Sequence, residues 1–159
     1  MIKFLDKVNI ETIQEELKTL PEGTLCLQGI SKDQDPYYGT GAVAEFTHDQ
    51  NIHPRDQEKA FHIPLFNIPY TNSIMEKFNM FRTRIMVQDS KTCYSYHRDF
   101  TPRIHIPLVT NDNCFFILED NLHRLKGDGS VYWVDTVQWH TAVNASWETR
   151  IHLVGCVDA

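Results

Sequence analysis

Six short segments rich in β-branched and aromatic residues fill the second half of the sequence, and they constrain the fold more than any other feature. Strands are enriched in these residue types, and clusters of Gly, Asn and Asp mark the turns between strands. The segments are residues 81–87, 93–99, 103–109, 114–119, 131–135 and 149–157. So many short strands in so little chain predict an antiparallel sandwich or a small barrel.

The first half of the sequence has a different pattern, with fewer strands and more helix. Apolar residues recur at helical spacing over residues 10–20, where Asn9 can cap the first turn and Pro21 ends the pattern. Residues 24–30 are typical of a strand, and a capping-box sequence that begins at Ser73 predicts a short helix through about residue 78. We therefore expect helices from residues 1–80 to support one face of a β-strand core formed by residues 81–159.

The composition is that of a globular protein. The 159 residues are 42% hydrophobic and 23% charged, which suits one domain spanning residues 1–159. The net charge of −6 argues against a nucleic-acid or anionic-membrane partner, because phosphates attract an excess of Lys and Arg, and it leaves a small molecule as the expected partner. The four cysteines stand singly and no run of eighteen apolar residues occurs, so we expect a cytoplasmic protein.

A long polar segment, residues 31–62, separates the predicted N-terminal strand from the remainder of the chain. Long irregular segments inside compact domains often bind substrate, although a solvated surface loop explains the composition equally well. Its candidates for substrate contact are Tyr37, Tyr38, His53 and Arg55.

Strand alternation predicts that several polar side chains share one face, because residues two apart in a strand point the same way. His97 and Asp99 project together, and Arg103 and His105 do so on the next predicted strand. Aliphatic residues alternate with the second pair and should face the core. On the last strand, Arg150 projects to one side together with the histidine two residues later.

Two imidazoles and one carboxylate form the donor set of many non-haem Fe(II) sites, which keep half of an octahedron open for substrates. An H-x-D triplet alone is common on solvated surfaces, so His97 and Asp99 by themselves are a weak signal. His140 and Arg150 follow on later predicted strands and could face the same cavity. Asn144 could support His140 through a hydrogen bond or could shape a turn.

The stretch resembles the aspartyl/asparaginyl β-hydroxylase-like branch of the Fe(II)- and 2-oxoglutarate-dependent dioxygenases, which includes small proline hydroxylases. The resemblance extends from Phe81 to Val157, about half of the chain. It is carried by the sequences HRD at residues 97–99, RIHIPL at 103–108, WHTAVN at 139–144 and RIHL at 150–153.

The resemblance implies a double-stranded β-helix, the jelly-roll or cupin-like fold, in which His97, Asp99 and His140 bind Fe(II). It further implies that Arg150 binds the distal carboxylate of 2-oxoglutarate, a role suited to the bidentate guanidinium. Arg103 and His105 match an R-x-H element that helps bind this co-substrate in some members. The implied enzyme consumes 2-oxoglutarate and O2, hydroxylates its substrate, and produces succinate and CO2.

The presence of Asp99 bears on the substrate, because aspartyl β-hydroxylases themselves lack the carboxylate ligand. The chain therefore looks more like the hydroxylases of free amino acids, acting on proline, another amino acid or a short peptide. Two alternatives remain open. One is a protein or peptide hydroxylase that reads its substrate with residues 31–62, and the other is a metal- or small-molecule-binding barrel without oxygenase activity.

Overall fold

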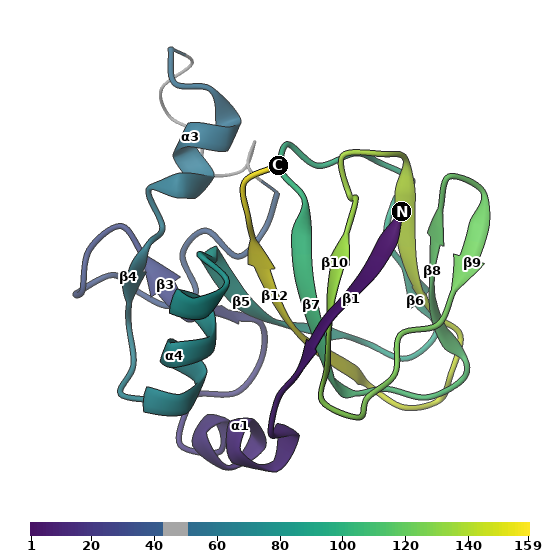
Figure 1. Cartoon of the computed structure of the whole chain (residues 1–159), viewed down its shortest axis with the longest axis horizontal. Coiled ribbons are helices and arrows are strands. Elements are labelled where there is room, and N and C mark those ends of the chain that lie inside the picture. The colour runs from purple at the N-terminus through teal and green to yellow at the C-terminus, as the bar shows by residue number, and fades with distance from the viewer. Residues whose placement is uncertain (43–50) are drawn as a thin grey trace.

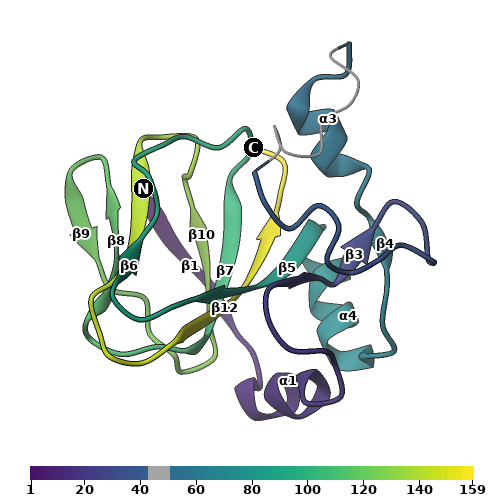
Figure 2. The same cartoon turned by 180° about the vertical axis from the view of Figure 1, so that it is seen from behind.

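The computed structural model describes residues 1–42 and 51–159. Most of its strands form two antiparallel sheets that pack against each other (Figures 1 and 2). The larger sheet has the order β1 (Ile2–Lys7), β10 (Ser130–Val134), β7 (Arg103–Val109), β12 (Arg150–Cys156), β5 (Phe81–Gln88) and β2 (Leu25–Cys26). The smaller sheet has the order β6 (Thr92–Cys93), β11 (His140–Asn144), β8 (Cys114–Leu118) and β9 (Asn121–His123). The expected mainly β fold is confirmed.

The remaining elements lie beside this sandwich. A two-stranded ribbon pairs β3 (Gln28–Gly29) with β4 (Ile63–Pro64). The helices of the described residues are α1 (Ile10–Leu17), α3 (Pro54–Lys59) and α4 (Pro69–Lys77). None of them is long and apolar enough to span a membrane.

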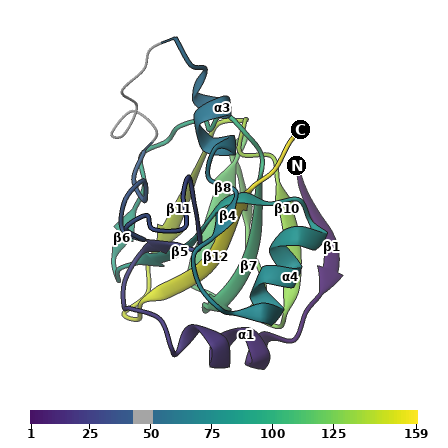
Figure 3. The ribbon, with the colours of Figure 1, turned by 90° about the vertical axis from the view of Figure 1, so that its left-hand side faces the viewer.

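The main core lies on the outer face of the larger sheet. Ile104 and Ile106 of β7 and Leu153 of β12 are buried there in one cluster with Ile13 of α1 and Met75 of α4. Each such side chain contributes about 1.5–3 kcal/mol when it leaves water. Helices α1 and α4 thus pack on one face of the sandwich, as the sequence predicted (Figure 3).

The inner face of the larger sheet carries the polar residues that alternate with this core. Arg103 and His105 of β7 and Arg150 and His152 of β12 are all buried. The His105 ring meets the ring of Phe116 in β8 edge-on, with centroids 4.9 Å apart. The predicted alternation is therefore confirmed, and it aims four titratable side chains at the smaller sheet.

Both predicted helix boundaries need correction. Asn9 caps α1 by accepting a hydrogen bond from the Thr12 N–H, as expected, but the helix ends at Leu17 because the following residues tighten into i→i−3 hydrogen bonds before Pro21. The capping box at Ser73 was wrong. Helix α4 begins at Pro69, whose fixed φ suits the first helical position, and Ser73 lies within the helix.

Two predicted strands and the polar segment also differ from the structure. Residues 24–30 divide into β2 and β3, which belong to different sheets. Of residues 93–99 only the start belongs to β6, and His97 makes an isolated bridge. Residues 31–62 contain α3, which the sequence did not predict, and residues 43–50 lie outside the described part of the chain.

Candidate metal centre

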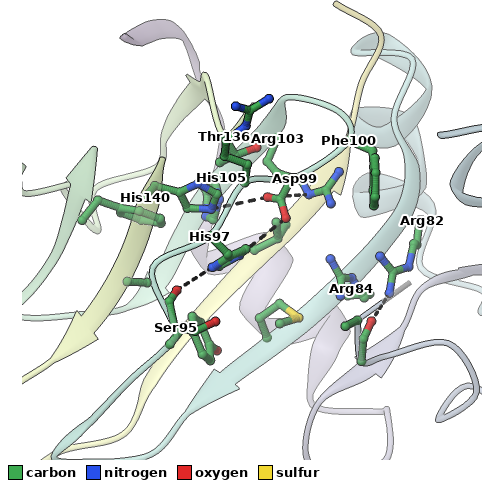
Figure 4. Close-up of a pocket in the computed structure, with 18 of the residues that line it drawn as sticks. Arg82, Arg84, Ser95, His97, Asp99, Phe100, Arg103, His105, Thr136 and His140 are labelled. Carbon is green, nitrogen blue, oxygen red and sulfur yellow. Dashed lines mark hydrogen bonds and ion pairs between the residues drawn. The ribbon is translucent and has the colours of Figure 1, made fainter. Parts of the chain in front are cut away.

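A cavity of about 610 Å³ opens between the two sheets. Strands β5, β7 and β12 form one wall, and β8 and β11 contribute Phe116, His140 and Ala142 to the other. The connection after β6 passes the cavity with His97 and Asp99 (Figure 4). The predicted ligands and Arg150 therefore meet at one site.

His97, Asp99 and His140 bring their ligand atoms within 4.8 Å of one another. Backbone pairing sets this geometry: the His97 N–H donates to the His140 carbonyl at 3.0 Å, and the His140 N–H donates back at 2.9 Å. The Asp99 N–H donates to the carbonyl of Thr136 at 2.8 Å, in the turn before β11. These backbone contacts place both imidazoles beside the carboxylate, with 3.6 Å from His97 Nε2 to Asp99 Oδ1 and 3.5 Å from His140 Nε2 to Asp99 Oδ2.

Each histidine is held in the tautomer that a metal ligand needs. His97 Nδ1 lies 2.6 Å from the carbonyl oxygen of Ser95, and His140 Nδ1 lies 2.9 Å from that of Gln138. A carbonyl oxygen only accepts, so Nδ1 carries the proton and the Nε2 lone pair points toward Asp99. Such a hydrogen bond on the far nitrogen fixes the ring orientation of metal-binding histidines.

The Asp99 carboxylate stays ionised although it is partly buried. Burial alone would raise the pKa of Asp99, but Arg103 and the two imidazoles outweigh it and hold that pKa well below its usual range. The neighbouring Asp99 carboxylate raises the pKa of His97 against the opposing effect of burial. Two imidazole nitrogens and one carboxylate oxygen on one side of an open cavity fit a divalent metal such as Fe(II).

Arg150 is a buried cation without a counter-charge among the described residues. It is 2% exposed, its side chain makes no hydrogen bond or ion pair with those residues, and its Nε is a buried donor without a partner there. Burial lowers the pKa of Arg150, while its guanidinium lies 5.9 Å from the centre of the Phe116 ring. A buried cation without a counter-charge destabilises the folded protein. An anionic group bound in the cavity would pair with Arg150 and offset this cost.

Arg103 and His105 also line the cavity, but their side chains already have protein partners. Arg103 pairs with Glu58 at 3.0 Å and approaches Asp99 at 3.5 Å. His105 Nδ1 lies 3.1 Å from Nδ1 of His152, and burial together with Arg150 holds the pKa of His105 well below its usual value. The two residues are next to the predicted co-substrate position, and their contact with it stays a prediction.

The four substrate candidates of the polar segment do not line the cavity. Tyr37 donates its hydroxyl proton to a backbone carbonyl at 2.8 Å, and Tyr38 stacks on a neighbouring ring. His53 precedes α3 and accepts a hydrogen bond from the N–H of Arg55 at 3.1 Å. The segment reaches the cavity through residues 40–42 instead, so substrate contact by these four side chains stays a prediction without a supporting contact.

Two cavity residues that the sequence reading missed are Arg82 and Arg84 of β5. Arg84 is 7% exposed, its Nη1 donates to the Thr40 carbonyl at 2.9 Å, and its Nε is a buried donor without a partner. Burial and the neighbouring Arg82 lower the pKa of Arg84 to about 10. The available signal was the spacing of two arginines within a strand-like run, which places both on one face.

Asn144 shapes a turn. Its side-chain amide donates to the carbonyls of Gln88, Asp89 and Glu148 at 3.1, 3.1 and 2.8 Å. Its Oδ1 accepts from the Ser146 N–H at 3.0 Å. These contacts favour the second of the two roles that the sequence left open.

A family model described as aspartyl/asparaginyl beta-hydroxylase matches residues 7–158. No curated protein matches the chain. The family match includes the N-terminal half, where the resemblance seen in the sequence did not extend.

Proposed function

The chain belongs to the aspartyl/asparaginyl β-hydroxylase family, and from this premise we propose that it is an Fe(II)- and 2-oxoglutarate-dependent dioxygenase that hydroxylates a free amino acid or a short peptide. The observation that carries the proposal is the pairing of two features in one cavity. A ligand set of two imidazoles and one carboxylate faces an open space, and the unpaired cation Arg150 lines the same space.

In this proposal His97, Asp99 and His140 hold Fe(II), with Nδ1 of each histidine anchored on a backbone carbonyl. Bound Fe(II) supplies the activation of O2 that couples decarboxylation of 2-oxoglutarate, to succinate and CO2, to hydroxylation of the substrate. Arg150 binds the distal carboxylate of 2-oxoglutarate, because a buried guanidinium without a partner gains most from a planar, bidentate anion. Met86, Phe116 and Val154 add apolar surface to the lining, which strengthens this charge pairing by excluding water.

A second unmatched cation bears on the substrate class. Arg84 lines the cavity, has no ion pair among the described residues, and retains an unpartnered Nε. With Arg150 assigned to the co-substrate, Arg84 remains for an anionic group of the substrate. A carboxylate is such a group, and every free amino acid carries one.

A panel of free amino acids and short peptides tests the proposal. The purified protein is supplied with Fe(II), ascorbate, 2-oxoglutarate and air, and succinate is measured with each compound. We expect at least one free amino acid to raise succinate formation at least tenfold above the uncoupled background, with a matching hydroxylated product. Absence of succinate with every compound, in protein that binds Fe(II), would overturn the proposal.

The two alternatives predict other outcomes, one in the same panel and one in metal and stability measurements. A peptide or protein hydroxylase would respond to peptides with internal Asp or Asn and not to free amino acids. A binding barrel without oxygenase activity would retain Zn(II) tightly and show no change in thermal stability with 2-oxoglutarate. Arg150 disfavours the binding barrel. A Zn(II) site formed by the two histidines and Asp99 does not require a buried cation without a partner beside it.

A further inference from the structure

A buried carboxylate on α3 joins two arginines of the larger sheet. Glu58 is 0% exposed, and its Oε2 lies 2.9 Å from Nη1 of Arg82 and 3.0 Å from Nη2 of Arg103. Burial alone would raise the pKa of Glu58, but the two guanidinium groups outweigh burial and lower it. Glu58 is therefore an anion in the interior, shared between two cations.

Arg103, one of the two arginines paired with Glu58, also reaches the proposed metal ligands. Arg103 extends its Nη atoms to Glu58, while its Nε lies 3.5 Å from Asp99 Oδ2, the oxygen that is also 3.5 Å from His140 Nε2. A distance of 3.5 Å is longer than a charge-assisted hydrogen bond, which is about 2.7–2.9 Å. Arg103 therefore forms its close ion pair with Glu58 and only approaches Asp99. The Asp99 carboxylate remains available to bind a cation in the cavity.

The other arginine reaches the edge of the cavity. Arg82 donates to the carbonyl of Gly39 from Nη2 at 2.8 Å and from Nε at 3.2 Å, and it also donates to the carbonyl of Gly41. Gly41 itself lines the cavity. Glu58 therefore connects the backbone at the cavity edge with the arginine that neighbours Asp99.

We propose that Glu58 is a positioning residue for the metal centre, which sets the orientation and effective charge of Asp99 by holding Arg103 away from a full ion pair with it. The inference rests on the proposed function, because it presumes that Asp99 binds the metal. Loss of the Glu58 charge frees Arg103 to pair with Asp99 and leaves one more uncompensated cation near the site. Both effects weaken the binding of a divalent cation.

Glu58→Gln tests this inference, because the substitution keeps the size of the side chain and removes its charge. The measurement is the Kd for Mn(II), followed by the loss of the free-ion signal in electron paramagnetic resonance, without 2-oxoglutarate or turnover. Altered partners of metal ligands typically cost about 10–100-fold in affinity, and we expect a weakening in this range. A Kd within about twofold of the wild-type value in folded protein would overturn the inference.

A matched control is Glu16→Gln. Glu16 of α1 is another carboxylate that joins two elements, since it accepts hydrogen bonds from the N–H groups of Tyr70 and Thr71 in α4 at 2.9 and 2.8 Å, but it lies outside the cavity lining. We expect this variant to lose thermal stability and to keep the wild-type Mn(II) Kd. Equal weakening in both variants would show a general effect of destabilisation and would overturn the positioning role.

If Glu58→Gln does not fold, Thr101→Val provides a second test of the positioning role. The Thr101 hydroxyl lies 3.3 Å from Glu58 Oε1 and also bonds to Nη1 of Arg103, so its removal loosens the same cluster without changing charge. We expect Mn(II) binding to weaken severalfold, and an unchanged Kd would overturn the inference.

The result is separable from the proposed function. If the wild-type protein makes no succinate but Glu58→Gln binds Mn(II) more weakly, the positioning role is supported and the hydroxylase proposal is overturned. A wild type that does not bind Mn(II) at all would overturn both.

Discussion

Replacing Arg150 by Met should weaken 2-oxoglutarate binding and at the same time stabilise the ligand-free protein. Arg150 is 2% exposed and has no ion-pair partner among the described residues, so the folded protein bears the cost of its desolvation without compensation. Exchange of buried charged groups for apolar side chains of similar volume is often stabilising by about 1–4 kcal/mol. For a chain of this size the Tm rises by about 2–4 °C per kcal/mol, so about 1–4 kcal/mol raises it by about 2–16 °C.

The effect on the co-substrate has the opposite sign. Truncating one partner of a buried, hydrogen-bonded charge pair costs about 2–5 kcal/mol, which is at least about 30-fold in Kd. At a 2-oxoglutarate concentration of about 100 times the wild-type Kd, binding adds about 2.7 kcal/mol to wild-type stability. If Arg150→Met raises the Kd about 100-fold, binding adds only about 0.4 kcal/mol to its stability at the same concentration. The ligand-induced rise in Tm then nearly disappears.

Thermal unfolding with Mn(II), with and without 2-oxoglutarate, measures both quantities. Arg124→Met is the matched control, because Arg124 is an exposed arginine outside the cavity lining. The control should keep the wild-type Tm within about 1–2 °C, as surface substitutions usually do, and keep the full ligand-induced rise. An Arg150→Met protein that is less stable than wild type, or that retains the ligand-induced rise, would refute the reasoning.

Two further substitutions test the roles of Arg84 and Asn144. Arg84→Met should raise the KM for the substrate about 10–100-fold, which is the range expected for loss of a hydrogen bond to a charged group. The Kd for 2-oxoglutarate should stay within about twofold of the wild-type value. An equal rise in both constants would contradict separate binding positions for substrate and co-substrate. Asn144→Ala should cost about 2–4 kcal/mol of unfolding free energy in a urea titration, because it leaves three backbone carbonyls without their donor, and should keep the Mn(II) Kd. Weaker Mn(II) binding by folded Asn144→Ala would instead support a role beside His140.

The face of the metal site could be predicted from sequence because strand alternation is a local property. Arg103 and His105 alternate with Ile104 and Ile106, and the first pair faces the cavity while the second is buried in the core beneath the helices. A period of two needs no knowledge of the partner strand. His97 and His140 were found for a different reason, since their residue types and order match a family pattern.

Other parts of the fold could not be predicted because they depend on distant partners. Strand β1 has four exposed residues among its six, so burial alone does not define it, and its conformation comes from pairing with β10. Helix α3 has six residues, too few to show a helical period. The role of Glu58 follows only from its meeting with Arg82 and Arg103, which lie 24 and 45 residues further along the chain.

The most direct test of the metal centre is an anaerobic titration of the protein with Fe(II) and 2-oxoglutarate, followed by visible absorption. We expect a charge-transfer band of iron chelated by the keto acid, saturating at one Fe(II) per chain, in the wild-type protein. Asp99→Asn and His140→Ala should lose the band, and Arg150→Met should require at least about 30-fold more 2-oxoglutarate to develop it. A wild-type protein without the band, or a band that persists unchanged in Asp99→Asn and His140→Ala, would contradict the assignment of these residues to the iron.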